Sequence, residues 1–200
     1  NRVYHNTSNG IDAGSGTSVR ENLVYSNAIG ISAWSDSEVV NNLVYGNATV
    51  GVGLGWRASA VNNTVYQPSG DAVRVQSSYA QLRNNLLWVH QGFAIAVASD
   101  SQVGFQSDYN DLYTTGTGQV AFWQGAARPT LTAWQNTAFT DQNSIAQDPR
   151  FVDADGADDL LGYSSPTSDG RDDDFHLQSL YGSYHAGALA PVRVIEDGEV

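Results

Sequence analysis

A cluster of aspartates in the C-terminal half of the chain has the residue types that bind hard cations. Its members are Asp153, Asp155, Asp158 and Asp159, and the first two belong to the turn-forming sequence Asp-Ala-Asp-Gly. Ca²⁺ takes several oxygen ligands from a flexible loop, and alternating carboxylates supply them. The cluster lacks the third alternating acid and the closing Glu of an EF-hand loop. The sequence therefore predicts either a Ca²⁺ site or solvated turns whose Asp side chains bond their own backbone.

A row of aromatic residues recurs along the first half of the chain and could stack on sugar rings. Its members are Tyr4, Tyr25, Tyr45, Tyr66 and Trp88. Each follows an apolar residue that we expect to point inward, so strand alternation would turn the ring outward. Neighbouring aromatic rings also stabilise one another by about 0.5–1.5 kcal/mol beyond burial. A carbohydrate-binding platform is the functional interpretation of the row. The structural alternative, which we favour, is that the rings pack on themselves or under the C-terminal segment.

Residues suited to acid–base catalysis are sparse in the same half of the chain. Glycoside hydrolysis needs two carboxylates about 5–9.5 Å apart, and polysaccharide elimination needs a base and a group that neutralises a uronate. Asp12 and Asp71 fall on different repeats, and Arg57 and Arg74 do not occupy matching positions. The four His share no recognisable spacing. We therefore identify no catalytic residue; if the chain is an enzyme, a polysaccharide lyase or glycoside hydrolase is expected.

An internal repeat sets the elements that must position these residues. Related units begin at Asn1, Asn22, Asn42, Asn63 and Asn85, in steps of 21, 20, 21 and 22 residues. Each unit contains three short apolar stretches with strand-like alternation, separated by Gly, Ser, Asn and Asp turns. Three strands in such a period predict one coil of a parallel β-helix, whereas a leucine-rich repeat would need a denser Leu pattern.

Stacking of coils about 4.8 Å apart would place equivalent residues in ladders. The first predicted core ladder contains Val3, Val24, Val44, Val65 and Leu87. The second contains Ile11, Ile31, Val52, Val73 and Ile95. The third contains Val19, Val39, Ala60 or Val61, Leu82 and Val103. The Asn that begins each unit is expected to bond to its equivalent on the next coil and to the turn backbone, which is a structural role.

The repeat also carries a resemblance to a known family. The pattern N-x-V-Y-x-N, followed by G-I and a terminal V-x-x-N, resembles the right-handed parallel β-helix repeats of the pectate-lyase-like superfamily over residues 1 to about 106. The stretches SDYNDLY, LTAWQ and DDDFHLQS look like the end of such domains in large secreted or surface bacterial proteins. This superfamily hosts lyases, hydrolases, epimerases, adhesins and passive spacers, so the resemblance implies a fold and an extracellular location but selects no activity.

The expected organisation is therefore a single all-β domain with a tail. Residues 1–106 form right-handed parallel β-helix coils of about 20–22 residues, and residues 107–190 form the last irregular coils and a cap. The cap contains a short helix that begins after Thr130, a residue type that caps helix N-termini. Residues 191–200 are predicted to be a linker or edge strand, with strand addition to a neighbouring copy as the alternative.

Charge and hydropathy exclude two classes of partner. The formal net charge is −12, no Lys is present, and most acids lie in residues 101–200. Phosphate backbones and anionic membrane surfaces need a basic face, so neither nucleic acid nor a membrane is an expected partner. No apolar run approaches the roughly 18–20 residues of a membrane span.

The missing catalytic pattern favours a non-catalytic extracellular module of a larger surface or filament-forming protein. Such a module would serve as a rigid spacer or an interaction surface, with other copies or flanking domains of the same protein as partners. The alternative is a carbohydrate-binding or polysaccharide-degrading β-helix protein, with polysaccharide as the partner and Ca²⁺ as the one cofactor the residues suggest.

Overall fold

The computed structural model describes residues 1–178 of the chain. The chain divides into two compact units, Asn1–Gln147 and Asp148–Val200. The predicted tail, residues 191–200, lies outside the described residues.

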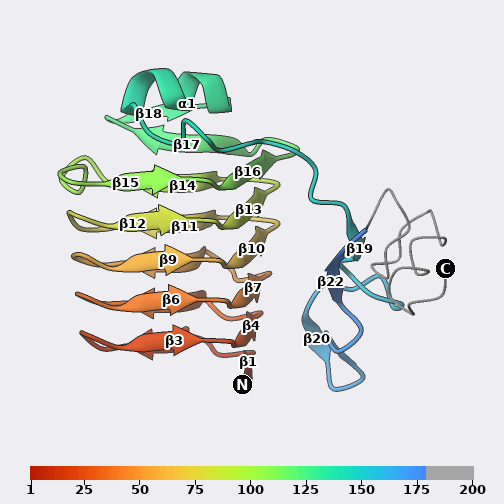
Figure 1. Ribbon diagram of the computed structural model, residues 1–200. Helices are drawn as coiled ribbons and strands as arrows, with labels where there is room; N and C mark the ends of the chain where they lie inside the picture. The colour runs from red at the N-terminus through yellow and green to blue at the C-terminus, as the bar shows by residue number, and fades with distance from the viewer. Residues whose placement is uncertain (179–200) are drawn as a thin grey trace, which may run out of the picture. The chain divides into compact units, whose positions relative to one another are not determined.

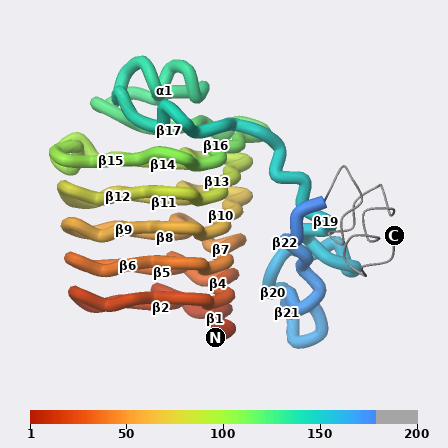
Figure 2. The backbone as a smooth tube through the Cα atoms, viewed as in Figure 1, coloured from red at the N-terminus to blue at the C-terminus, as the bar shows by residue number. Residues whose placement is uncertain are grey.

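Three sheets of stacked strands build the first unit (Figure 1, Figure 2). The first sheet contains β1 (Arg2–Tyr4), β4 (Leu23–Tyr25), β7 (Leu43–Tyr45), β10 (Thr64–Gln67), β13 (Leu86–Val89) and β16 (Asp111–Thr114). The second contains β2 (Asn9–Ala13), β5 (Ile29–Ala33), β8 (Val50–Leu54), β11 (Asp71–Val75), β14 (Phe93–Val97), β17 (Gln119–Trp123) and the antiparallel β18 (Ala126–Arg128). The third contains β3 (Ser18–Arg20), β6 (Glu38–Val40), β9 (Ser59–Val61), β12 (Gln81–Arg83) and β15 (Gln106–Asp108). The described residues thus form five complete three-strand coils, and the predicted parallel β-solenoid is confirmed.

Two of the predicted core ladders have the predicted register. Val44 pairs with its ladder neighbours on β4 and β10, and Val52 pairs with its neighbours on β5 and β11. The members on the first coil, Val3 and Ile11, are partly buried, whereas all later members are fully buried. Each buried Val or Ile side chain stabilises the fold by about 1.5–3 kcal/mol, so the ladders supply the core.

The third ladder departs from the prediction on the fifth coil. Its first four members are in register and buried, but the residue that pairs with Leu82 is Ser107. Val103, the predicted member, is 62% exposed and lies in the turn between β14 and β15. That turn is longer than the turn between β5 and β6, and the additional residues displace the apolar position from the strand.

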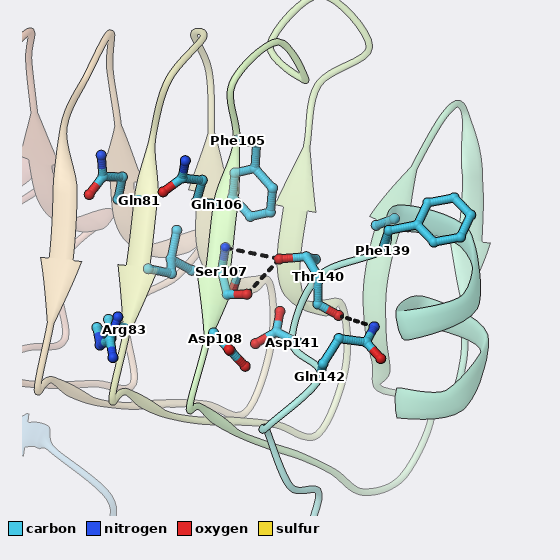
Figure 3. A pocket seen from close by; sticks show the side chains of 12 residues that line it. Gln81, Arg83, Phe105, Gln106, Ser107, Asp108, Phe139, Thr140, Asp141 and Gln142 are labelled. Carbon is cyan, nitrogen blue, oxygen red and sulfur yellow. Dashed lines mark hydrogen bonds between the residues drawn. The ribbon is translucent and has the colours of Figure 1, made fainter.

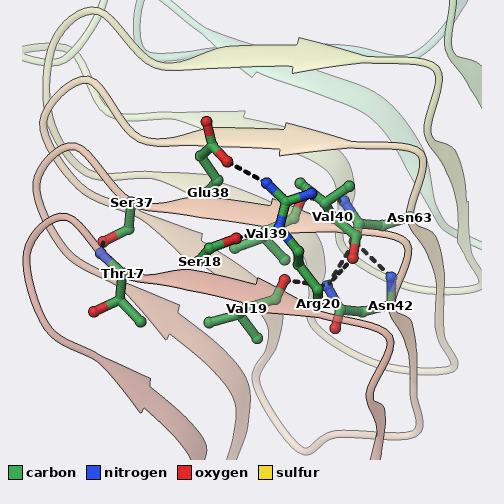
Figure 4. Close-up of polar contacts among 10 residues, drawn as sticks. All are labelled: Thr17, Ser18, Val19, Arg20, Ser37, Glu38, Val39, Val40, Asn42 and Asn63. Atoms are coloured by element: carbon green, nitrogen blue, oxygen red, sulfur yellow. Dashed lines mark hydrogen bonds and ion pairs between the residues drawn. The ribbon is translucent and has the colours of Figure 1, made fainter.

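Two columns of amide side chains connect the coils. The first column runs through Asn1, Asn22, Asn42, Asn63, Asn85 and Asn110, and each Nδ2 donates to the next Oδ1 at 3.0–3.1 Å. Figure 4 shows the step from Asn42 to Asn63 beside the third sheet. The predicted structural role of the unit-start Asn is thereby confirmed, although the left-handed turn conformation lies at the preceding residue, as at Asn41 and Asn62.

The second column was not predicted. Asn6 donates to Asn27 at 2.8 Å, and Asn27 donates to Asn47 at 3.1 Å. Gln67 ends this column, because its Oε1 accepts from the backbone N–H of Asn47 and its Nε2 donates back to the Asn47 carbonyl. Both columns satisfy buried turn groups that would otherwise weaken the fold.

The end of the first column is closed by a helix and a carboxylate. The helix α1 (Leu131–Ala138) begins after Thr130, whose hydroxyl accepts from the N–H of Ala133, and the predicted capped helix is confirmed. Fully buried Asp141 follows it and accepts from Asn110 Nδ2 at 2.9 Å and from Trp134 Nε1 at 2.7 Å. An ionised carboxylate accepts hydrogen bonds and donates none, so Asp141 can end a column in which each amide donates to the next residue. No helix among the described residues is long and apolar enough to cross a membrane.

The second unit contains short antiparallel pairs. β19 (Phe151–Asp153) pairs with β22 (Asp174–Leu177), and β20 (Tyr163–Ser165) pairs with β21 (Ser168–Asp169). Within residues 148–178 the buried positions are Gly156, Gly162 and Gly170, all with positive φ. This unit therefore has no buried apolar side chain in its described part.

Candidate ligand-binding groove

A groove of about 390 Å³ lies against the third sheet, between its last strands and the segment that follows α1 (Figure 3). The side chains that give it chemical character are Gln81, Arg83, Gln106, Asp108, Phe139 and Gln142. On β12 the central Leu82 belongs to the core, so the residues on both sides of it point outward, and β15 repeats the arrangement. The strands therefore present two rows of polar side chains to the groove.

The far wall of the groove is fixed to the edge of β15. The Thr140 hydroxyl accepts from the Ser107 N–H at 3.0 Å and donates to the Ser107 carbonyl at 2.5 Å, as Figure 3 shows. The backbone N–H of Asp141 donates to the same carbonyl at 2.8 Å. Gln142 is oriented by a 3.1 Å hydrogen bond from its Nε2 to the Thr140 carbonyl. These hydrogen bonds hold the far wall in place, and a wall held by the protein's own contacts lowers the entropic cost of binding a ligand.

Asp108 supplies an ionised acceptor at one end of the groove. Its Oδ1 accepts from the Asn143 N–H at 2.8 Å and from the Tyr109 N–H at 3.0 Å, and its Oδ2 accepts from Asn143 Nδ2 at 2.8 Å. Burial disfavours the carboxylate, but these hydrogen bonds and the charge of Arg83 outweigh it and hold the pKa of Asp108 below its usual value. Asp108 is thus ionised at neutral pH and suited to positioning a ligand rather than to proton transfer.

The remaining groove side chains offer hydrogen bonds and an apolar face. Gln81 and Gln106 are exposed at equivalent positions of neighbouring strands, and an amide both donates and accepts. The Arg83 guanidinium lies 4.7 Å from the centre of the Tyr109 ring, which limits its motion. Phe139, in the left-handed position that ends α1, is 84% exposed at the rim. The combination suits a ligand that carries hydroxyl groups on an apolar ring.

The predicted aromatic row forms two stacks. Tyr25 lies between Tyr4 and Tyr45, with ring centroids 5.1 and 4.8 Å apart, and both Tyr25 and Tyr45 are fully buried. Tyr66 stacks on Trp88 at 4.2 Å, and the Trp88 indole donates to the Thr115 hydroxyl at 3.1 Å. Rings that share a face cannot offer that face to a sugar, so carbohydrate binding by this row stays a prediction.

The predicted calcium ligands lie near one another in the second unit. Within residues 1–178 no group of three or more His, Asp or Glu side chains is arranged to hold a metal ion. Burial, and then the charge and hydrogen bond of neighbouring Asp155, raise the pKa of Asp153. Asp158 Oδ1 instead accepts from the Leu160 N–H at 3.0 Å, as in a solvated turn. A Ca²⁺ site here stays a prediction, tested below with the ion itself.

Three of the charged residues considered for catalysis, Asp71, Arg74 and Arg57, are engaged in ion pairs. Asp71 Oδ2 accepts from Arg74 at 2.9 and 2.7 Å, and its Oδ1 accepts from the Phe93 N–H at 3.1 Å. Arg57 pairs with Asp36 at 3.0 Å on another part of the surface. The structure therefore does not bring Arg57 and Arg74 together, in agreement with their unmatched positions in the repeat.

The groove itself was missed by the sequence reasoning. Gln81 and Gln106 lie 25 residues apart, outside the 20–22 residue steps, because of the long turn before β15. Gln142 and Phe139 reach the groove only through the chain reversal after α1. The sequence did contain one indication of the groove, because the polar residues Gln81 and Arg83 flank the core residue Leu82 and so predict an outward-facing polar surface.

Comparison with known proteins assigns no family. The chain matches no protein-family model, no curated protein and no solved structure. The parallel β-solenoid is thus what is established, and the pectate-lyase-like relationship stays an expectation.

Proposed function

We propose that the chain is a non-catalytic module of a larger extracellular or surface protein, in which the solenoid is a rigid spacer that presents an interaction surface. The observation that carries this proposal is the first amide column. It links every complete coil to the next through side-chain hydrogen bonds of 3.0–3.1 Å, which are buried at every step after the first, in addition to the backbone ladders. Connected polar networks of this kind resist local opening, because one broken bond leaves buried donors unsatisfied.

Hydrogen–deuterium exchange tests the rigid-spacer proposal. Amides of β4 to β14 are expected to exchange slowly and together, because opening one coil disrupts the hydrogen bonds of its neighbours. Asn42→Ala should speed exchange in the adjoining turns, whereas Ser15→Ala, at an exposed turn position of the first coil, should leave it unchanged. Rapid, independent exchange of interior coils in the unmodified protein would contradict a rigid spacer.

The groove favours a second candidate function, carbohydrate binding without turnover. Its support is the combination of three Gln side chains, Arg83 and exposed Phe139 in a preformed cavity of about 390 Å³. Titration with soluble polysaccharides should detect binding that Gln106→Ala weakens and that Gln91→Ala, an exposed turn variant, does not. The same mixtures should release no reducing ends and no unsaturated products. Release of either would contradict the non-catalytic assignment while leaving binding intact.

A further inference from the structure

Three exposed aromatic side chains stand at the corner between the second and third sheets. Trp34, Trp56 and Tyr79 lie in the turns that follow β5, β8 and β11, on three successive coils. They are 57%, 40% and 47% exposed, respectively. The core does not require aromatic residues at these positions, since the corresponding turn after β2 consists of small polar residues and Gly. We define these three residues as the corner aromatic row.

Trp34 is held in place while its ring stays accessible. Its indole Nε1 donates to Asp12 Oδ1 on the preceding coil at 2.8 Å. The backbone pairing places Gly14 and Gly55 at the equivalent positions of the coils on either side. Because neither neighbour has a side chain, the ladder leaves Trp34 without a flanking side chain at its own position.

Trp56 and Tyr79 form an ordered pair on the next two coils. Their rings meet edge to face, with centroids 6.4 Å apart. The Arg57 guanidinium lies 4.7 Å from the centre of the Trp56 ring and pairs with Asp36 at 3.0 Å. The Tyr79 ring lies so close to Gly104 that a Cβ there would be 2.3 Å from a ring carbon. Both rings are therefore held by neighbouring groups, while 40% of Trp56 and 47% of Tyr79 stay exposed.

We propose that the corner aromatic row binds a neutral polysaccharide. The rings would stack on the apolar faces of successive sugar rings, and Asp12, Asp36 and Arg57 would bond to their hydroxyl groups. Successive coils lie about 4.8 Å apart, so the row extends along the solenoid axis and suits a chain rather than a compact ligand. The proposal is independent of the groove beside the third sheet.

The charged groups at the corner favour a neutral polysaccharide over an anionic one. The corner has two carboxylates and one guanidinium within the contacts described, and the whole chain has a net charge of −12. Uronate polymers and nucleic acids would meet two carboxylates here and a single guanidinium, which already pairs with Asp36. Charged groups contact two of the rings, Asp12 at Trp34 and Arg57 at Trp56, which distinguishes the corner from the apolar centre of a protein–protein interface.

Native affinity electrophoresis of the full chain provides the test. The gels would contain hydroxyethyl cellulose, galactomannan or arabinoxylan as neutral probes, and polygalacturonate as the anionic probe. We expect retardation by at least one neutral probe and none by polygalacturonate. Trp34→Ala and Trp56→Ala should each raise the Kd about 2- to 12-fold, the range typical of one aromatic stacking contact. Circular dichroism melting of each variant verifies that it is folded.

Two control variants separate the corner from other sites. Tyr109→Ala removes an aromatic residue that is 48% exposed and has Arg83 4.7 Å from its ring, but lies at another corner. Gln106→Ala alters the groove. The proposal holds if both Trp variants bind a neutral probe more weakly than the unmodified protein and than Gln91→Ala, an exposed turn variant. Weaker binding by Gln106→Ala, or by Tyr109→Ala, whose ring contacts Arg83, reports on the groove separately. The proposal is overturned if no neutral probe retards the protein, if polygalacturonate retards it equally, or if only Gln106→Ala weakens binding; the last result would support the groove instead.

Discussion

The two units of the chain are stabilised by different interactions. In the first unit, aliphatic ladders form a core in which Val44, Val52 and their equivalents have no exposed surface. In residues 148–178, the buried positions are glycines, and carboxylates bond to backbone N–H groups. Asp173 Oδ2 accepts from the Gly162 N–H at 2.8 Å, and Asp172 Oδ2 accepts from the Asp158 N–H at 3.2 Å. Apolar burial thus dominates one unit, and turn geometry with charged acceptors dominates the other.

This difference predicts different sensitivities. In the first unit, each coil buries apolar side chains against the equivalent side chains of the next coil. A polar substitution in one of these ladders should therefore lower the stability of this unit more than other changes do. A unit built on carboxylate-bonded turns should respond instead to pH and to changes of charge. Variants in each unit therefore test whether the two units depend on different interactions.

The largest effect is expected from Val52→Asp. The change buries an unpaired carboxylate in the centre of the second ladder and should lower the free energy of unfolding by several kcal/mol, of the order given for unsatisfied buried polar groups. Urea unfolding measures it. Val103→Asp is the matched control, because Val103 is 62% exposed and should change stability by less than about 0.5 kcal/mol. Equal midpoints for the two variants would refute the ladder as the source of stability.

The end of the first amide column should be the next most sensitive position. Asp141→Ala leaves Asn110 Nδ2 and Trp134 Nε1 without their carboxylate acceptor, at a cost of about 1–3 kcal/mol for each buried donor. Asp141→Asn retains one acceptor oxygen and should cost less. Chemical denaturation of the two variants, compared at one pH, gives the difference. If the Ala variant were no less stable than the Asn variant, the carboxylate would not be closing the column.

Asp108 should contribute a pH-dependent stabilisation to the first unit. Its folded-state pKa is lowered, so its contribution is fully present above the unfolded value of about 3.9 and is lost as the pH falls through the lower folded pKa. Asp108→Asn should therefore lower the thermal midpoint at pH 7 and have a shrinking effect below about pH 4. Melting curves between pH 2 and 7 test this, and a constant difference across that range would contradict it.

Asp153 should behave in the opposite sense in the second unit. Burial and the nearby carboxylates of Asp155, Asp159 and Asp174 raise its pKa, so its neutral form is favoured and its ionisation weakens the fold as the pH rises through the folded pKa. Asp153→Asn should slightly raise the thermal midpoint at pH 7 and leave it unchanged in acid. A lower midpoint at pH 7 would show that the ionised carboxylate has a favourable partner.

Calcium should have the smallest effect. Since no described cluster of acids is arranged around a cation position, millimolar CaCl₂ is expected to leave the thermal midpoint unchanged. Differential scanning fluorimetry with Ca²⁺, Mg²⁺ and EDTA makes the measurement. A rise that occurs with Ca²⁺ and is reversed by EDTA would instead establish the site predicted at Asp153 and its neighbours.

The fold could be predicted from the sequence because one sequence repeat corresponds to one coil of the solenoid. Val24, Val44 and Val65 recur at steps of 20 and 21 residues, and stacking places each directly above the last. The second amide column was equally accessible, since Asn27 and Asn47 also recur at one step, but its last member is Gln67 and breaks the literal pattern.

The end of the first unit and its groove could not be predicted in the same way. Asp141 reaches Asn110 from 31 residues downstream, and Thr140 reaches Ser107 from 33 residues downstream. Neither separation belongs to the repeat, and the contacts depend on how α1 turns the chain back. The corner aromatic row had a signal in the unusual Trp34 and Trp56, but the exposure of Trp34 follows from glycine neighbours on adjacent coils, which only the register reveals.

The uniform direction of the first amide column has a consequence for how such a molecule changes length. Every rung donates toward the C-terminal side, and Asp141 receives the last donor. A duplicated coil with its own Asn would accept from the rung before it and donate to the rung after it, so neither terminus of the column would need to change. Each duplication would lengthen the solenoid by about 4.8 Å, the distance between paired strands. Duplication of whole coils can therefore change the length of the solenoid in equal steps.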